Sequence, residues 1–274
     1  MMTPAPTVPD GAVPVAAGTG DPACGPPAPP GAAGPRFRVR SGRPEVWLVR
    51  RPAGVAARAL ARSELDEAER LRAASFRRPA DALLYTAAHV ALRRLIGRYT
   101  GTAPRDVRFL REPCPGCGLP HGRPSVAPAP PPLHFSLSHS GDLAAVAVAA
   151  VPVGVDVQRL PAAEAVDICA RALHPDERAE LAATRGREER RRHFGDLWTR
   201  KESYLKGLGT GLGRSPAEDY LGADTRRHPR GWTLAQVPCD VAHAACVAVR
   251  ETAPVEVEVH RVPDDWLAAG SAVR

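Results

Sequence analysis

The carboxylate of Asp156 lies among apolar residues, where a charged group costs free energy unless it is paired or bound to a ligand. Asp156 lies within the apolar run Val153–Val157. If this run is a strand, its valines share one face, while Gly154, Asp156 and Gln158 share the other. A buried carboxylate has to be paired or bound to a cation. We therefore expect a cation site at this face, with Gly154 leaving open space beside Asp156; an aspartate that caps the next turn is the alternative.

A second carboxylate, Glu202, lies on a predicted helix next to the rarest charged residue of the chain. Only two of the 37 lysines and arginines are lysines, Lys201 and Lys206. Trp198, Glu202 and Lys206 are spaced by four residues, so they share one helix face. A compact ammonium is expected to be needed here, where a planar guanidinium would not serve. The alternatives are chance clustering of the lysines and an ordinary Glu–Lys surface pair.

Two further segments have residue types that suit phosphate binding. Ser138-His139-Ser140-Gly141 is predicted to form a turn after a strand, where an imidazole N–H and hydroxyls could contact phosphate oxygens. A polar surface turn is the simpler interpretation. The glycine-rich stretch Gly207–Gly213 follows a predicted helix and does not lead into one. It is therefore interpreted as a helix terminator and not as a phosphate-binding loop.

The segment Cys114-Pro115-Gly116-Cys117, with His121 close behind, has ligand types that zinc prefers. His134 is the candidate for a fourth ligand. A single Cys-x-x-Cys pair is a weak signal, so an ordinary loop is favoured over a structural zinc site.

The elements that must position these residues alternate between strands and helices along the chain. Residues 1–36 are rich in Pro, Gly and Ala and are predicted to be a disordered tail. Strands are predicted at 45–49, 133–137, 143–150, 153–157, 232–237, 244–249 and 255–262. Helices are predicted over 81–99, 162–172, 175–184 and 188–208, and another begins at Ser63. Residues 111–132 are predicted to be a Pro/Gly-rich loop.

Composition and charge limit the class of protein without choosing a function. The net charge of +7 and pI of about 9.5 favour an anionic partner, such as a phosphorylated molecule, an acidic protein or a nucleic acid. No uncharged apolar window is long enough for a membrane span, and no secretory signal is visible. Six scattered cysteines do not form a disulfide framework, so the cytoplasm is the expected location.

Taken together, the motifs resemble the signature of one enzyme family. The order of Ser138–Gly141, Gly154–Val157, Trp198–Lys206 and Gly209–Leu212 is similar to that of Sfp-type phosphopantetheinyl transferases. The resemblance covers about 45–262. It implies an α/β (α+β) fold in which two similar subdomains, here 37–151 and 152–274, meet in a pseudo-twofold arrangement around a cleft for coenzyme A.

The resemblance also implies roles for the central residues. Asp156 and Glu202 look like the family's magnesium ligands, and Glu202 is also the candidate base for the hydroxyl of a carrier-protein serine. Lys206 and His139 would contact phosphates of coenzyme A, and Ser138 would assist. Many members carry an acidic residue where this chain has Gln158. Its amide oxygen can still serve the metal, but the choice between Mg²⁺ and Mn²⁺ is left open.

Further basic residues are assigned to coenzyme A by the same resemblance. Arg123 corresponds to a basic residue near the nucleotide, and Arg72 and Arg77 lie where the first subdomain of the family offers cations to phosphate. After Asp81 the family often has an arginine, whereas this chain has alanine and leucines.

The function implied is transfer of the 4'-phosphopantetheine group of coenzyme A to a serine of an apo acyl or peptidyl carrier protein. The products are the holo carrier and adenosine 3',5'-bisphosphate, for fatty acid, polyketide or nonribosomal peptide synthesis. A monomer that binds no membrane is expected. Two alternatives remain: a basic nucleic-acid-binding module and a non-catalytic carrier-protein-binding relative. The first of these leaves Asp156, Glu202 and the paired lysines unexplained.

Overall fold

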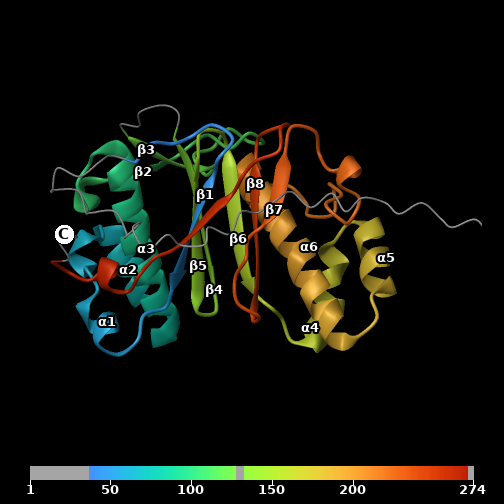
Figure 1. Cartoon of the computed structure of the whole chain (residues 1–274), viewed down its shortest axis with the longest axis horizontal. Helices are drawn as coiled ribbons and strands as arrows, with labels where there is room; N and C mark the ends of the chain where they lie inside the picture. The colour runs from blue at the N-terminus through green and yellow to red at the C-terminus, as the bar shows by residue number, and fades with distance from the viewer. Residues whose placement is uncertain (1–36, 128–132, 271–274) are drawn as a thin grey trace, which may run out of the picture.

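The structure, a computed structural model, describes residues 37–127 and 133–270 of the 274-residue chain. The predicted tail 1–36 lies outside the described residues. Two sheets stand side by side in the middle of the molecule, with one group of helices on each outer side (Figure 1). The first sheet has the order β4-β5-β1-β9 and the second the order β6-β8-β7.

The strands and helices have the following bounds. The first sheet consists of β1 (Glu45–Arg50), β4 (His134–Ser140), β5 (Leu143–Ala149) and β9 (Glu258–Arg261). The second consists of β6 (Val153–Arg159), β7 (Thr233–Gln236) and β8 (His243–Val249). A separate hairpin consists of β2 (Arg108–Arg111) and β3 (Pro124–Ala127). The helices are α1 (Gly54–Ala59), α2 (Glu67–Ala74), α3 (Pro79–Thr100), α4 (Ala163–Cys169), α5 (Pro175–Ala183) and α6 (Arg187–Leu208).

Strands β1 and β5 of the first sheet are buried on both faces, which explains why they are largely apolar without a polar alternation. Trp47 and Val49 on one face of β1 pack in the core with residues of α3. Val46 and Leu48 on the other face pack in a second core with Val155 and its neighbours on β6. The molecule is therefore layered as helices, sheet, sheet and helices, and the α/β class predicted from the sequence is confirmed.

Serine side chains join the two sheets where their edge strands meet. The hydroxyl oxygen of Ser136 on β4 accepts a hydrogen bond from the backbone N–H of Val155, and that of Ser140 accepts one from Arg159, each at 3.1 Å. These bonds satisfy backbone donors of β6 that no strand ladder reaches on this edge. The predicted turn at 138–141 is therefore wrong: β4 continues to Ser140, because its alternate serines are needed along β6.

Gly154 allows α6 to pack directly on β6 and does not leave the open space that was expected. A β-carbon at this position would lie 2.0 Å from the carbonyl oxygen of Ser203 and 2.4 Å from the backbone nitrogen of Gly207, both on α6. The expected open space beside Asp156 is thus filled by α6. Glycine is required here because two backbones come into direct contact.

Most of the remaining elements agree with the sequence predictions, with three corrections. The helix predicted to begin at Ser63 begins at Glu67, because Asp66 and Glu69 form a capping box. The predicted loop 111–132 contains β3, which pairs with β2 although a proline opens the strand. The predicted strand 255–262 is shorter, since β9 spans Glu258–Arg261.

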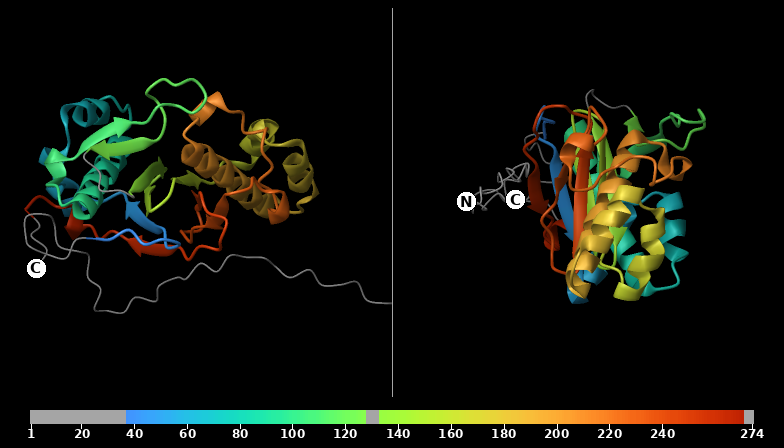
Figure 2. Two further views of the ribbon diagram at one scale, coloured as in Figure 1. Left: turned by 90° about the horizontal axis from the view of Figure 1, so that it is seen from above. Right: turned by 90° about the vertical axis from the view of Figure 1, so that its right-hand side faces the viewer.

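The chain returns at its end to the sheet in which it began. Strand β9 pairs in parallel with β1, with Val46 opposite Val259, and the two strands lie side by side in Figure 2. The last strand therefore belongs to the first sheet. The division into 37–151 and 152–274 stays a prediction.

We predict that Gly154→Ala destabilises the fold. The added methyl group must push α6 away from β6, and overpacking of this kind costs about 1–3 kcal/mol. Urea unfolding measures the change. The control is Gly213→Ala, since a β-carbon at Gly213 meets no atom within 4 Å. Equal midpoints for the two variants would contradict the close approach of the backbones.

Candidate functional site

A cleft of about 690 Å³ opens where the first helices, the β2–β3 hairpin, strand β4 and the end of α6 meet. Apolar side chains make up part of its wall, namely Leu92, Phe109, Phe135 and Leu137. Arg72, Arg123 and Lys206 add positive charge. The cleft can thus take a molecule with both an apolar stretch and anionic groups.

Asp156 is the buried acceptor at the centre of the site, with only 4% of the residue exposed. Its Oδ1 accepts hydrogen bonds from the Ser138 hydroxyl at 2.7 Å and from Lys206 Nζ at 2.6 Å. Within the part of the chain that the structure describes, its Oδ2 is buried and has no hydrogen-bond partner. An unsatisfied buried carboxylate oxygen is costly, so this atom is available for a ligand such as a cation.

Glu202 lies close enough to Asp156 for their charges to interact. Burial raises the pKa of Glu202, the negative charge of Asp156 raises it further, and Lys206 opposes both effects. The two carboxylates come from different elements, β6 and α6. They are brought together because Gly154 lets the helix contact the strand. The expected proximity of these two residues is therefore found in the structure.

Lys206 links the carboxylates to the cleft. Its ammonium group contacts both the Asp156 carboxylate and the Ser138 hydroxyl, the latter at 2.9 Å, and its side chain lines the cleft. Ser138 is buried and its hydroxyl is already used by these two groups. Ser138 therefore positions Asp156 and Lys206 and does not present a free hydroxyl to the cleft.

His139 and Gln158 lie at the margins of this arrangement. His139 is exposed, and its ring lies edge-on to Tyr85 of α3, with centroids 6.1 Å apart. Partial shielding of the ring from water disfavours its charged form and lowers the pKa of His139, and the charges of His89 and Lys206 lower it further. Gln158, two residues after Asp156, donates from Nε2 to the carbonyl oxygen of Arg159 at 3.1 Å, which leaves its amide oxygen available.

The three predicted arginines differ in where they lie. Arg123 lines the cleft, forms an ion pair with Glu112 at 2.7 Å and donates to the carbonyl oxygen of Gly207 at 3.1 Å. Arg72 also lines the cleft, with its guanidinium over the ring of Phe76. Arg77 is exposed and is not among the residues that line the cleft.

A polar cluster on the cleft wall was missed by the sequence analysis. Burial alone would raise the pKa of Glu69, but hydrogen bonds from His89 at 2.9 Å and from Arg93 at 2.6 Å lower it overall. Arg93 is fully buried and also pairs with Asp66 at 2.6 Å. The available signal was an arginine with apolar residues, Val90 and Ile96, three positions away on either side in a predicted helix, since a buried arginine is costly unless paired.

Lys201, the other lysine, faces away from the cleft. It is 1% exposed and forms an ion pair at 2.6 Å with Glu177 of α5, which is fully buried. It also donates to the carbonyl oxygen of Asp219. Lys201 therefore holds α6 against α5 and the segment before Leu221.

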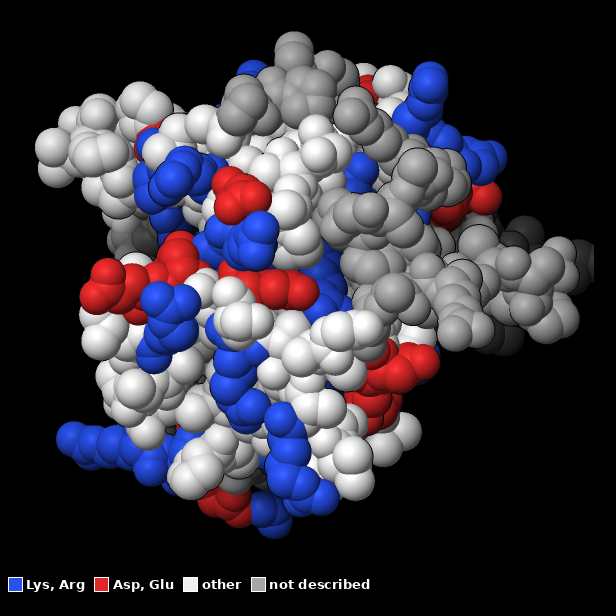
Figure 3. All heavy atoms as spheres, turned by 90° about the vertical axis from the view of Figure 1, so that its left-hand side faces the viewer, with Lys and Arg blue, Asp and Glu red and all other residues white. Residues whose placement is uncertain are grey.

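Charges of both signs cover the side of the molecule where α1, α2 and α3 lie. Lysine and arginine side chains are interspersed with aspartate and glutamate over the described residues visible there (Figure 3). Exposed charges of opposite sign in this part of the chain can pair, as Arg105 does with Asp106 at 3.9 Å. This face therefore does not offer the continuous basic surface that a nucleic-acid backbone favours.

Comparison with known proteins points to one family. A family model described as the 4'-phosphopantetheinyl transferase superfamily matches residues 152–259 of the chain. The chain is 31% identical over 195 residues to the 4'-phosphopantetheinyl transferase HetI of Nostoc sp., which covers 68% of this chain and 78% of HetI. It is 28% identical over 157 residues to the 4'-phosphopantetheinyl transferase Sfp of Bacillus subtilis, which covers 57% of this chain and 63% of Sfp.

A further 4'-phosphopantetheinyl transferase of Bacillus subtilis is 36% identical over 92 residues, 34% of this chain and 40% of that protein. The chain thus spans less than two thirds of that relative and of Sfp. The match to HetI covers more than two thirds of both proteins, so this chain belongs to the 4'-phosphopantetheinyl transferase family. Among the described residues, none of the helices is both long and apolar enough to span a membrane.

Loss of the Lys201 ammonium should destabilise the protein strongly. Lys201→Met leaves the buried Glu177 carboxylate without its cation, and breaking a buried pair in this way costs about 3–5 kcal/mol. Denaturant unfolding at neutral pH measures the loss. The additional change Glu177→Gln should restore part of it.

The control for this experiment is Glu188→Gln, which breaks the more exposed pair with Arg191 on the same helix. A surface pair is worth about 0–1 kcal/mol. If Lys201→Met and Glu188→Gln cost the same free energy of unfolding, the buried pair does not hold α6 in place.

Proposed function

We propose that the protein transfers the 4'-phosphopantetheine group of coenzyme A to a serine of an apo acyl or peptidyl carrier protein. The observation that carries the proposal is the buried Oδ2 of Asp156, which has no hydrogen-bond partner among the described residues. Asp156 lies near Glu202 and in a cluster with Lys206, beside a cleft of about 690 Å³. In the reaction, the serine oxygen bonds to the phosphorus that carries pantetheine, and the pyrophosphate P–O bond breaks. The second product is adenosine 3',5'-bisphosphate.

The donor set suits a hard divalent cation. Asp156 and Glu202 would hold Mg²⁺, and the amide oxygen of Gln158 could ligate directly or through water. Mg²⁺ takes one or two protein carboxylates and completes its octahedron with water and substrate phosphates. Mn²⁺ accepts the same oxygen ligands. When bound, the cation would neutralise the negative charge that develops on the pyrophosphate.

The side chains of the protein supply the remaining steps. Glu202 would take the proton of the carrier serine, directly or through a water molecule, and its raised pKa suits a base that works near neutral pH. Lys206 would share its positive charge between Asp156 and a substrate phosphate. His139 would donate an N–H to a phosphate on the nucleotide side.

The cleft wall fits the rest of coenzyme A by chemistry. The pantetheine arm would lie against the apolar side chains of Phe109 and Phe135, while Arg72 and Arg123 would face the phosphates. Arg77 has the weakest claim, because it does not line the cleft. We also propose that the chain works as a monomer in the cytoplasm, where its cysteines, which are free among the described residues, stay reduced.

The transfer reaction is tested by mass spectrometry of intact apo carrier proteins incubated with the chain, coenzyme A and Mg²⁺. We expect a gain of one phosphopantetheine group that EDTA abolishes. Asp156→Asn and Glu202→Gln should each slow transfer by at least about 100-fold, the lower end of what a positioned acid or base contributes. Asp167→Asn, an exposed aspartate on α4, is the control and should leave the rate unchanged.

No gain with any carrier type, from a folded protein, would contradict the enzymatic proposal. Retained binding of carrier protein without transfer would then favour a non-catalytic relative, in which Gln158 has replaced a needed carboxylate. Binding of nucleic acid in place of carrier protein would favour the basic-module alternative.

The ionised Glu202 carboxylate should lower the free energy of unfolding, although the proposed reaction needs it. Because its pKa is raised in the folded protein, its ionised form costs free energy. Without added metal, the stability of the wild type relative to Glu202→Gln should fall as pH rises from about 4.5, the ordinary glutamate value, through the raised pKa. Above that pKa the inactive variant should be the more stable protein.

Urea unfolding across this pH range measures the difference, and added Mg²⁺ should reduce it by stabilising the ionised wild type. If Glu202→Gln is less stable than the wild type at neutral pH, the ionised Glu202 carboxylate does not destabilise the fold.

A further inference from the structure

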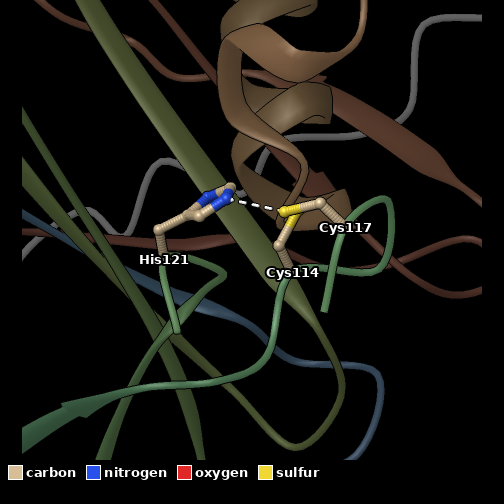
Figure 4. Close-up of side chains that lie close together, drawn as sticks. All are labelled: Cys114, Cys117 and His121. Atoms are coloured by element: carbon tan, nitrogen blue, oxygen red, sulfur yellow. Dashed lines mark hydrogen bonds between the residues drawn. The ribbon is translucent and has the colours of Figure 1, made fainter. Parts of the chain in front are cut away.

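A cluster of two cysteines and a histidine lies outside the proposed catalytic site. One candidate ligand atom from each of Cys114, Cys117 and His121 lies within 4.8 Å of the other two. The closest pair is Cys117 Sγ and His121 Nε2, at 2.9 Å. In Figure 4 the three side chains converge on one point above the loop that carries them.

The loop that carries this cluster continues the β2–β3 hairpin and is held by its own backbone. The N–H of Cys114 donates to the carbonyl oxygen of Leu119, and the N–H of Gly118 donates to the carbonyl oxygen of Cys114, both at 2.8 Å. Gly118 has a φ of +75°, a conformation that favours glycine. The turn therefore points both sulfurs to one side, where the ring of His121 meets them.

The ligand chemistry selects the kind of metal. Two thiols and an imidazole are soft and borderline ligands, which suit zinc and not magnesium. Zn–S bonds of about 2.3 Å and Zn–N bonds of about 2.0 Å in a tetrahedron place ligand atoms roughly 3.5 Å apart. The closest pair of ligand atoms lies 2.9 Å apart and every pair lies within 4.8 Å, so small side-chain rotations would complete the geometry. Both cysteines are free thiols, so no disulfide competes.

The coordination is open on one side. Among the described residues, His134, the expected fourth ligand, does not belong to the cluster. Cys117 and His121 are exposed to solvent, whereas Cys114 is buried. A water molecule can therefore occupy the fourth position.

The cluster lies directly beside a wall of the cleft. His121, Gly122 and Arg123 all line the cleft. Arg123 reaches the carbonyl oxygen of Gly207 at the end of α6, next to Lys206. A metal that joins the two ends of this turn would restrict the segment from which Arg123 extends.

We propose that Cys114, Cys117 and His121 bind one Zn²⁺ ion, which fixes the loop 112–123 as a wall of the cleft. The sequence alone favoured an ordinary loop. The convergence of three ligand atoms from a rigid turn reverses that preference. The site stands on its own and does not depend on the proposed transfer reaction.

The test uses the full-length protein, stripped with a chelator and titrated with Co²⁺, a spectroscopic substitute for zinc. One equivalent should produce thiolate-to-cobalt charge-transfer absorption, and added Zn²⁺ should remove it. Cys117→Ser should reduce this absorption and weaken Co²⁺ binding, because one of the two thiolates is lost. His121→Asn should weaken Co²⁺ binding at least tenfold. Both residues are exposed, so the fold should tolerate either change. Cys169→Ser, an exposed free cysteine on α4, and Asp156→Asn should keep the full absorption.

A second measurement is alkylation by iodoacetamide with peptide mass spectrometry. Zn²⁺ should slow modification of Cys117 at least tenfold and leave Cys169 unaffected. The proposal is overturned if Cys117 reacts equally with and without Zn²⁺, or if Cys117→Ser keeps both the full charge-transfer absorption and the Co²⁺ affinity of the wild type. Failure of carrier-protein transfer would leave both readouts unchanged, so the two proposals fail independently.

Discussion

The site depends on the direct contact between the backbone of α6 and the backbone of β6. Gly154 and Gly207 make this contact possible, because neither carries a side chain to hold the two elements apart. The contact brings Glu202 within the field of Asp156 and lets Lys206 reach its carboxylate. Like charges placed together in a buried site cost free energy. The packing of α6 must therefore be firm, and the Lys201–Glu177 pair adds to it from the opposite face.

The free edge of β6 explains why serines alternate along β4. Ser136 and Ser140 satisfy backbone N–H groups of this edge, while Ser138, between them, turns its hydroxyl to Asp156. Three serines at alternate positions thus perform one structural task and one electrostatic task. Their exchange for apolar residues would leave buried donors without partners.

Local patterns were enough to predict most of the elements. The alternation around Asp156 predicted its strand, the spacing of Glu202 and Lys206 predicted their shared helix face, and the apolar runs predicted the central strands. That the two carboxylates lie together was implied only by the resemblance to the transferase family. The partners of Lys201 and the role of Gly154 could not be predicted, because they depend on how α6 docks against α5 and β6. The end of β4 was misplaced for the same reason: the backbone of a distant strand decides where it ends.

The pairing of β9 with β1 has a consequence for how the chain can fold during synthesis. Val46 is made long before its partner Val259, with most of the two sheets and all of the labelled helices lying between them in the sequence. Arg94 of α3 likewise donates to the carbonyl oxygen of Ala268 at 3.0 Å. Strand β1 keeps an unpaired edge until β9 has been synthesised, and an unpaired edge is a site of aggregation. A chain that terminates before β9 would leave the edge of β1 permanently unpaired. Such a shortened chain should depend on chaperones even after synthesis, whereas a chain that contains β9 should not.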